Sequence, residues 1–317
     1  MAAQASRAVL PYVQPMRTRR RITPLIALSI ALAACGGGDD SVSPATTVAP
    51  VEETTTTTTP TTTPEDVAIG ADVHYAGFLL HLEELTVDDD GLALITGTAD
   101  NLGATASRPP SNLTLDLGGE AILLSDLSSE MPEVPGESTG EVAYAFLLPD
   151  DADLGAATLL VGGPDYARAE VPLGATGELI ANEPVAVPLT GKVAAGETTF
   201  TFDGGELRFD VPDEHEPAEA GKAYLTLSFA VTNSSSFAGG YAFAGEDLRL
   251  ETPSGITLAP DEFPIELLDP NASLTDLFAR WTIDADEPGT YTFVGLRNVG
   301  LPDQAEGRLE IEVPAAV

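Results

Sequence analysis

The chain offers few side chains for catalysis, because its 317 residues include one cysteine and three histidines. The histidines are His74, His81 and His215. The string GESTG at 136–140 matches the pattern G-x-S-x-G, with Ser138 in the place of a nucleophile. That pattern needs a strand–turn–helix elbow, whereas Pro135 precedes this string and a strand-like segment follows it. We therefore interpret GESTG as a polar turn and predict that the protein is not an enzyme.

Histidines can also bind metals, but their positions here do not favour it. His74 and His81 are separated by an odd number of residues, so a straight strand would place them on opposite faces. His215 lies within DEHEP (213–217), whose carboxylates could hold Zn²⁺ or Cu²⁺ weakly. A solvated acidic loop is the simpler interpretation of that segment.

Clusters of carboxylates are stronger candidates for a metal site. Asp88, Asp89 and Asp90 precede Gly91 in a turn-like segment. Two further acidic loops occupy matching places in an internal repeat, namely Asp150, Asp151 and Asp153 in the first and Asp284, Asp286 and Glu287 in the second. Calcium takes six to eight oxygen ligands, but no segment has the EF-hand spacing. We expect no cofactor, with calcium as the alternative.

The single cysteine, Cys35, directly follows a segment that has the pattern of an export signal. Residues 1–34 contain five arginines and no acidic residue, and 22–34 are mostly apolar. Thirteen residues are too few to span a bilayer, but they fit the apolar region of a secretory signal peptide. Because RTRRR follows Met16, we expect translation to start at Met16.

The sequence LAAC at 32–35 resembles the lipobox of bacterial lipoproteins. In that family the cysteine receives a diacylglyceryl group, and the signal peptide is cut just before it. The resemblance implies cleavage between Ala34 and Cys35 and lipidation of Cys35, as in palmitate-bearing lipoproteins. Two acyl chains give stable membrane anchoring, whereas one gives only marginal binding.

Composition excludes several other classes of protein. The formal net charge is −36, which argues against binding to nucleic acid and against electrostatic adhesion to anionic lipid. The apolar fraction of 43% is ordinary for a globular protein. One cysteine cannot form an intramolecular disulfide. The acidity is explained by a solvated surface, although it would also attract divalent cations.

A low-complexity segment follows the cysteine. Residues 35–66 are rich in Thr, Pro and Gly and have almost no large apolar side chains, so we expect a disordered linker. About thirty residues of extended chain would reach roughly 90 Å. This linker would hold the folded part away from the membrane.

From residue 67 onward, apolar residues alternate with polar ones in segments such as 92–99, 142–147, 225–231 and 308–313. Alternation with period two predicts half-buried antiparallel strands. We predict an all-β fold with two domains, 67–176 and 185–317, and short helical turns near 123–129 and 273–278.

An internal repeat supports two domains. LALITGTADN (92–101) aligns with YLTLSFAVTN (224–233), and the segment 143–162 aligns with 277–296. EELTVD (83–88) aligns with GELRFD (205–210), at a shorter offset, because the second copy carries an insertion at 211–221. Repetition at this period indicates a duplicated domain.

Aromatic residues are sparse. Trp281, Phe278, Tyr291 and Phe293 lie in strand-like segments, so we expect them in the core. The Gly-broken segment 237–243 carries Phe237, Tyr241 and Phe243. These rings either cover the end of a sandwich or form a contact surface for a partner.

The strand ending in Thr232-Asn233, the strand LRLETPSG and the turn DEPGTYTF resemble immunoglobulin-like, or telokin-like, extracellular domains of bacterial lipoproteins. The resemblance is moderate over 196–313 and weaker over 72–173, and it implies two tandem antiparallel β-sandwiches but no shared chemistry. Together with the lipobox, it predicts a lipoprotein on the extracytoplasmic face of the membrane that acts as a non-enzymatic binding or structural module. Its partner would be an envelope protein or glycan. The alternative is a calcium-dependent adhesion or ligand-binding module.

Overall fold

The computed structural model of this chain describes residues 67–125, 128–174 and 177–315. The expected signal peptide, Cys35 and the linker to residue 66 lie outside these residues. Within them, the regular structure consists of β-strands and three single turns of 3-10 helix, η1 (Leu154–Ala156), η2 (Pro212–Glu214) and η3 (Gly245–Asp247). No helix in this part of the chain is long and apolar enough to cross a membrane.

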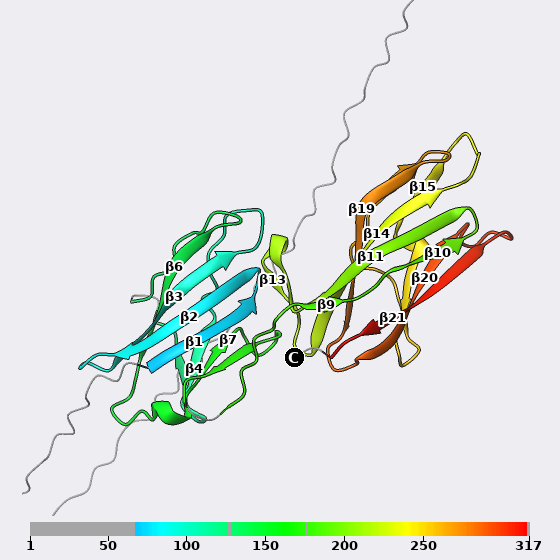
Figure 1. Cartoon of the computed structure of the whole chain (residues 1–317). Coiled ribbons are helices and arrows are strands. Elements are labelled where there is room, and N and C mark those ends of the chain that lie inside the picture. The colour runs from blue at the N-terminus through cyan, green and yellow to red at the C-terminus, as the bar shows by residue number, and fades with distance from the viewer. Residues whose placement is uncertain (1–66, 126–127, 175–176, 316–317) are drawn as a thin grey trace, which may run out of the picture. The chain divides into compact units, whose positions relative to one another are not determined.

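Strands β1 to β8 form a first sandwich of two four-stranded antiparallel sheets, with orders β1-β2-β3-β6 and β5-β4-β7-β8 (Figure 1). In β3 every second residue is buried, so its alternating sequence turns one face to the core. The strands are β1 (Val67–Tyr75), β2 (Phe78–Val87), β3 (Leu92–Asn101), β4 (Leu113–Asp116), β5 (Ala121–Leu123), β6 (Thr139–Leu147), β7 (Thr158–Val161) and β8 (Ala169–Pro172).

Strands β9 to β21 form a second sandwich. One sheet has the order β10-β11-β14-β19, with β9 also paired to β11, and the other has the order β17-β16-β20-β21. The short pairs β12-β13 and β15-β18 lie outside these sheets. The strands are β9 (Val185–Val187), β10 (Gly191–Ala195), β11 (Thr198–Arg208), β12 (Asp210–Val211), β13 (Glu216–Pro217), β14 (Lys222–Asn233), β15 (Tyr241–Phe243), β16 (Leu248–Glu251), β17 (Thr257–Leu258), β18 (Glu266–Leu268), β19 (Ser273–Asp284), β20 (Gly289–Arg297) and β21 (Ala305–Val313).

The two sandwiches have the same strand order. When β1, β2 and β3 are matched with β10, β11 and β14, strand β6 matches β19 beside them. In the opposite sheets, β5-β4-β7-β8 matches β17-β16-β20-β21 in the same sequence. The expected all-β fold of antiparallel β-sandwiches is therefore confirmed. The structure also matches the ends of β3 and β14, so Asn101 and Asn233 are equivalent residues.

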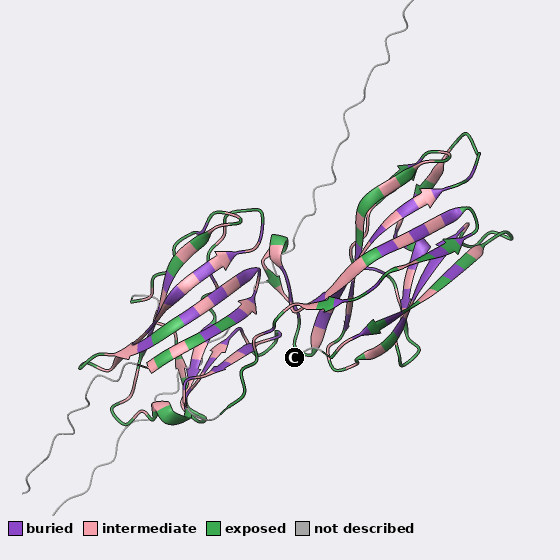
Figure 2. Cartoon of the chain, viewed as in Figure 1, coloured by how far each residue is buried: buried purple, intermediate pink, exposed green. Residues whose placement is uncertain are grey.

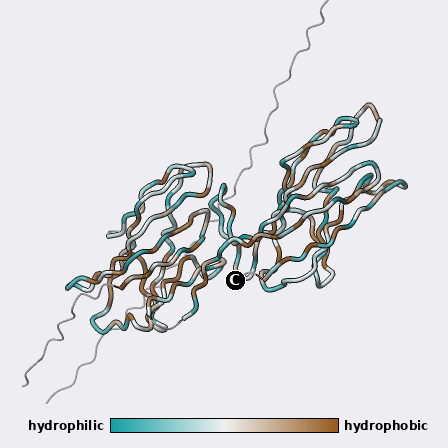
Figure 3. The backbone as a smooth tube through the Cα atoms, viewed as in Figure 1, coloured by the Kyte–Doolittle hydropathy of each residue, from teal (hydrophilic) through white to brown (hydrophobic). Residues whose placement is uncertain are grey.

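Each sandwich encloses its own hydrophobic core, and the two cores have no residue in common (Figures 2 and 3). The second core contains a cluster of phenylalanine rings, with neighbouring ring centroids between 4.8 and 6.2 Å apart. Its members are Phe200, Phe202, Phe229, Phe243 and Phe293. The first core is mainly aliphatic, with Tyr75, Phe78, Tyr144 and Phe146 as its buried rings. Burial of these apolar faces is the main force that stabilises both sandwiches.

Two expectations about strand β19 are wrong. Residues 273–278 form the start of this strand rather than a helical turn. Its pairing with β14 places Ala279 and Trp281 on the core side, so Phe278 lies on the opposite face and is 42% exposed. Trp281, Tyr291 and Phe293 are buried, as expected.

Candidate functional site

The expectation that His74 and His81 lie on opposite faces is wrong. The chain reverses between β1 and β2 at Ala76 and Gly77, both of which have positive φ. Because Asp72 pairs with His81 and His74 with Leu79, the two histidines lie on the same outer face of the sheet. Because the chain reverses between them, the two histidines lie on the same face although an odd number of positions separates them in the sequence.

On this face His81 lies between two carboxylates. Its Nδ1 is 2.7 Å from Asp72 Oδ1, and its Nε2 is 3.1 Å from Asp100 Oδ2. The hydroxyl of Thr139 donates to the other oxygen of Asp100 at 2.5 Å. The hydrogen bonds to Asp100 and Asp72 raise the pKa of His81, because they favour the charged imidazole. Both ring nitrogens are occupied, so the cluster forms a polar clamp across three strands.

Ser138 lies in a turn before β6, and its hydroxyl donates to the carbonyl of Gly136 at 3.1 Å. The strand Thr139–Leu147 follows directly. The local structure is therefore the turn that the sequence predicts and not a strand–turn–helix elbow.

The acidic loops occupy corresponding corners of different sandwiches. Asp150, Asp151 and Asp153 lie between β6 and β7, and Asp284, Asp286 and Glu287 lie at and beyond the end of β19. Asp153 accepts a hydrogen bond from the Gly155 amide at 2.9 Å. Asp284 pairs with Lys222 at 2.5 Å. Within 67–125, 128–174 and 177–315, no group of three or more His, Cys, Asp or Glu side chains converges as a metal site.

The three aromatic residues of 237–243 have different environments. Phe243 is fully buried in the second core, because β15 pairs with β18 and turns it inward. Tyr241 lies under the guanidinium of Arg297, whose Cζ is 4.4 Å from the ring centroid. Phe237 is 68% exposed. Of the three expected contact residues, only Phe237 presents a largely exposed ring.

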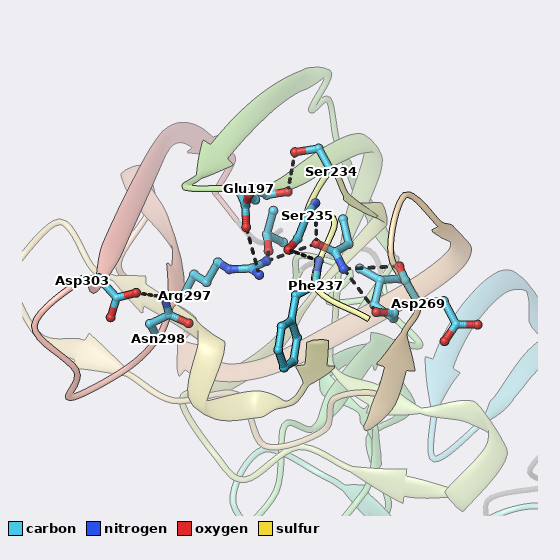
Figure 4. A network of polar contacts seen from close by, with 11 residues as sticks. Glu197, Ser234, Ser235, Phe237, Asp269, Arg297, Asn298 and Asp303 are labelled. Carbon is cyan, nitrogen blue, oxygen red and sulfur yellow. Dashed lines mark hydrogen bonds and ion pairs between the residues drawn. The ribbon is translucent and has the colours of Figure 1, made fainter. Parts of the chain in front are cut away.

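Arg297 is the centre of a polar network at one end of the second sandwich (Figure 4). The residue is only 8% exposed, and its guanidinium donates to the Thr198 hydroxyl at 2.5 Å. It also lies 3.6 Å from the Glu197 carboxylate. Burial, with the neighbouring Asp247 carboxylate, raises the pKa of Tyr241. A buried arginine held by polar partners and an aromatic face closes this end of the sandwich.

Asn233 connects the loops of this network. It is fully buried, and its amide donates to the carbonyls of Leu268 and Asp269, both at 3.2 Å. Its side-chain oxygen accepts from the Ser235 amide at 3.0 Å.

Asn101 makes similar contacts in the first sandwich. Its amide donates to the carbonyl of Val134 in the crossing loop and to that of Thr105 in its own loop, and its side-chain oxygen accepts from the Gly103 amide. Both copies of the repeat therefore have an asparagine that hydrogen-bonds the end of this strand to the crossing loop.

The insertion at 211–221 carries a contact between the two sandwiches that the sequence did not predict. We call Asp210–Pro217, which comprise β12, η2 and β13, the joint hairpin. Asp210 is 3% exposed and accepts a hydrogen bond from the Gly77 amide at 2.7 Å. Asp213 accepts from the Ala104 amide at 3.0 Å. The ring of His215 packs against Phe78, with centroids 5.4 Å apart.

The first sandwich receives this hairpin at a socket, which we define as Ala76, Gly77, Phe78, Gly103 and Ala104. A Cβ atom on Gly77 would lie 2.6 Å from the carbonyl oxygen of Pro212, and one on Gly103 would lie 2.5 Å from it. Both distances are too short for van der Waals contact, so glycine is required at both positions. His215 Nδ1 also lies 3.3 Å from the carbonyl oxygen of Ala76.

Two hollows flank this joint. The first, of about 440 Å³, is lined by residues of both sandwiches, among them Tyr75, Phe78, Arg108, Asn112, Tyr166 and His215. The second, of about 810 Å³, is lined mainly by 164–170 and 178–182, together with Phe209, Ala220, Gly221 and Ala285. Tyr166 lines both hollows and is 43% exposed. The joint thus combines concave surface with polar side chains.

The chain matches no protein-family model, and no curated protein is similar to it in sequence.

Proposed function

We propose that this chain is a lipoprotein anchored on the extracytoplasmic face of the membrane through Cys35. Its two sandwiches would serve as a non-enzymatic binding or structural module of the cell envelope. The observation that carries this proposal is the position of the only cysteine, directly after Leu32-Ala33-Ala34 and behind an arginine-rich and apolar leader. A diacylglyceryl cysteine would tether the chain stably.

The surroundings of the histidines support a role other than catalysis. Both ring nitrogens of His81 face carboxylates, and Nδ1 of His74 is buried without a hydrogen-bond partner. His215 packs against the socket. Within the described residues, no hydrogen bond joins a histidine to a hydroxyl that it could activate as a nucleophile.

The joint supports the display of both sandwiches as a pair. Beyond the joint hairpin, the Ala167 amide donates to the Ala218 carbonyl at 2.8 Å, and the Ala220 amide donates to the Asp165 carbonyl at 2.9 Å. Backbone hydrogen bonds of this kind, together with a desolvated carboxylate, hold neighbouring domains more firmly than a linker alone. A binding surface that spans both sandwiches would then keep its geometry.

Metabolic labelling with a fatty acid tests the anchor. We expect the wild-type chain to take up label and to sediment with membranes, while protease added to intact cells cleaves the sandwiches. Cys35→Ser should take up no label and should leave the membrane fraction, because no other thiol is present.

A displaced cysteine provides the matched control. Cys35→Ser combined with Ser41→Cys restores a thiol six residues further on, outside the LAAC sequence, and should remain unlabelled. Labelling of either variant, or an unlabelled wild type, would show that the proposed anchor is wrong.

A further inference from the structure

Arg108 has an unusual environment among the arginines of the described residues. Each of the other arginines there has a carboxylate or a backbone carbonyl within bonding distance, as Arg168 has Glu170 and Arg249 has Gly245. Arg108 lines the 440 Å³ hollow and has neither an ion pair nor a hydrogen bond within the described residues. A guanidinium carries five N–H donors, so this hollow offers donors that no protein group there satisfies.

The wall that carries Arg108 is held in place by its neighbours. Ser107 pairs with Val134 through two backbone hydrogen bonds of 3.0 and 2.7 Å. Pro109 and Pro110 follow Arg108 and restrict the backbone. Asn112, at the end of the wall, donates to the Tyr75 hydroxyl at 2.9 Å. A concave surface that is formed before binding loses little entropy when a ligand binds.

Part of the remaining lining is aromatic or apolar. Tyr166 is 43% exposed, and the partly buried His215 and Pro217 contribute further surface above the buried ring of Phe78. The face of an aromatic ring carries partial negative charge and attracts weakly positive C–H groups. A ligand that complements this hollow therefore has both a C–H face and several hydrogen-bond acceptors.

Charge decides between the ligand classes. Among the described residues that line the hollow there is no carboxylate, and Arg108 is the one permanently charged side chain. The formal net charge of the whole chain is −36. The field of the chain disfavours an anionic ligand, and Arg108 disfavours a cationic one. A neutral polyol is left, because its hydroxyl and ring oxygens accept hydrogen bonds without adding charge.

We propose that the hollow formed by 107–112, Tyr166 and the joint hairpin binds a neutral glycan, with one pyranose ring on Tyr166 and its oxygens bound by Arg108. Tyr166 also lines the 810 Å³ hollow, so neighbouring sugar units extend into that second hollow. Both volumes lie within the range of about 300–1,000 Å³ that is usual for ligand sites. This inference rests on the proposed binding role and specifies its ligand.

The test is isothermal titration of the full chain, extracted in detergent, with oligosaccharide tetramers of different charge. The neutral probes are cellotetraose and N-acetylchitotetraose, the anionic probe is tetragalacturonate, and the cationic probe is chitosan tetramer. We expect a neutral probe to bind at least about tenfold more tightly than either charged probe. Arg108→Met should weaken that binding by about tenfold or more, because it removes charged donors.

Two further comparisons separate binding from folding. Tyr166→Ala should also weaken binding by about tenfold, whereas Tyr166→Phe keeps the ring and should bind nearly as the wild type does. Lys192→Gln is the matched charge control, since Lys192 is exposed on β10, has no ion pair in the described chain and lies outside both hollows. This variant should bind normally.

Tighter binding of a charged probe, or equal binding by wild type and Arg108→Met, would overturn the proposed ligand class. Absence of binding by every neutral probe at millimolar concentration would overturn the site. Neither result affects the labelling of Cys35, so failure of this inference and failure of the proposed anchor are distinguishable.

Discussion

The two sandwiches differ at the corner where the first pair of strands turns: the corner of the first sandwich binds another part of the chain, and that of the second is filled by its own side chains. The β1–β2 turn of the first sandwich corresponds to the β10–β11 turn of the second, because Tyr75 pairs with Phe78 as Ala195 pairs with Thr198. Gly77 therefore corresponds to Glu197. In the first sandwich this corner is a glycine-lined socket that receives the joint hairpin.

In the second sandwich the corresponding corner is filled by side chains of that sandwich itself. Glu197 lies beside Arg297, and Ser235, the counterpart of Gly103, accepts a hydrogen bond from the Phe237 amide through its hydroxyl. The buried asparagine is the element that both corners keep. The difference shows that the strand framework and the asparagine determine the fold, while the residues placed on the turns determine what each corner can contact.

We expect the largest loss of stability from replacing the buried asparagine that both corners share. Asn101→Ala and Asn233→Ala should each lower the free energy of unfolding of their own sandwich by about 2–3 kcal/mol, because each leaves buried backbone groups without partners. Urea denaturation with limited proteolysis assigns the loss to one sandwich. A loss in only one copy would show that the two asparagines are not equivalent in energy.

Replacement of a socket glycine by alanine should destabilise the protein more than the same replacement at a glycine outside the socket. Gly103→Ala places a Cβ atom against the Pro212 carbonyl and should cost about 1–3 kcal/mol at the joint. Calorimetry should then resolve separate unfolding of the two sandwiches in place of a coupled transition. Gly191→Ala is the control, since its Cβ would approach only Leu309 side-chain atoms, at 3.3 and 3.5 Å.

Removal of the arginine from the filled corner should affect the second sandwich alone. Arg297→Met loses the contact with Tyr241 and the hydrogen bond to Thr198, at a cost of about 1–2 kcal/mol. Thermal unfolding should show a lower melting temperature for the second sandwich with the joint contact intact. A loosened joint in this variant would contradict the separation of the two corners.

The smallest effect concerns the outer face near β1 and β2. Where the first sandwich has Asp72, His81 and Asp100, the second has Lys192, Thr201 and Thr232. The raised pKa of His81 means that its contribution is complete below the unfolded value of 6.5 and disappears as pH rises through the folded value.

His81→Gln should therefore lower the free energy of unfolding at pH 5, by at most about 1 kcal/mol for this partly exposed cluster, but not at pH 9. Thermal unfolding at the two pH values measures the difference. Thr201→Gln, at the equivalent position, should leave the pH dependence unchanged. An equal loss at both pH values would contradict the contribution of the charged imidazole.

The sequence predicts the framework better than the contacts. Period-two alternation identifies β3 and β14, and the repeat pairs Asn101 with Asn233, because both signals are local. The insertion at 211–221 is visible as an offset. The hydrogen bond from Gly77 to Asp210, the residue just before the insertion, joins residues 133 positions apart, and no local pattern records it.

Two errors have equally physical causes. Ala76 adopts positive φ in the β1–β2 turn, and an alanine does not signal this conformation, so the sequence does not reveal the chain reversal between His74 and His81. Phe243 belongs to the core because β15 pairs with β18. The glycines on either side of β15 favour a loop, so the sequence does not predict this pairing. The hollows beside Tyr166 depend on two separate sandwiches and could not be inferred from either alone.

The filled corner of the second sandwich has a consequence for which surfaces a hairpin of this kind can recognise. A hairpin with the backbone of the joint hairpin would meet the carboxylate of Glu197 and the hydroxymethyl group of Ser235 where the first sandwich offers bare backbone. Such a hairpin would therefore distinguish the two sandwiches, and loss of both side chains would be needed before it could bind the second.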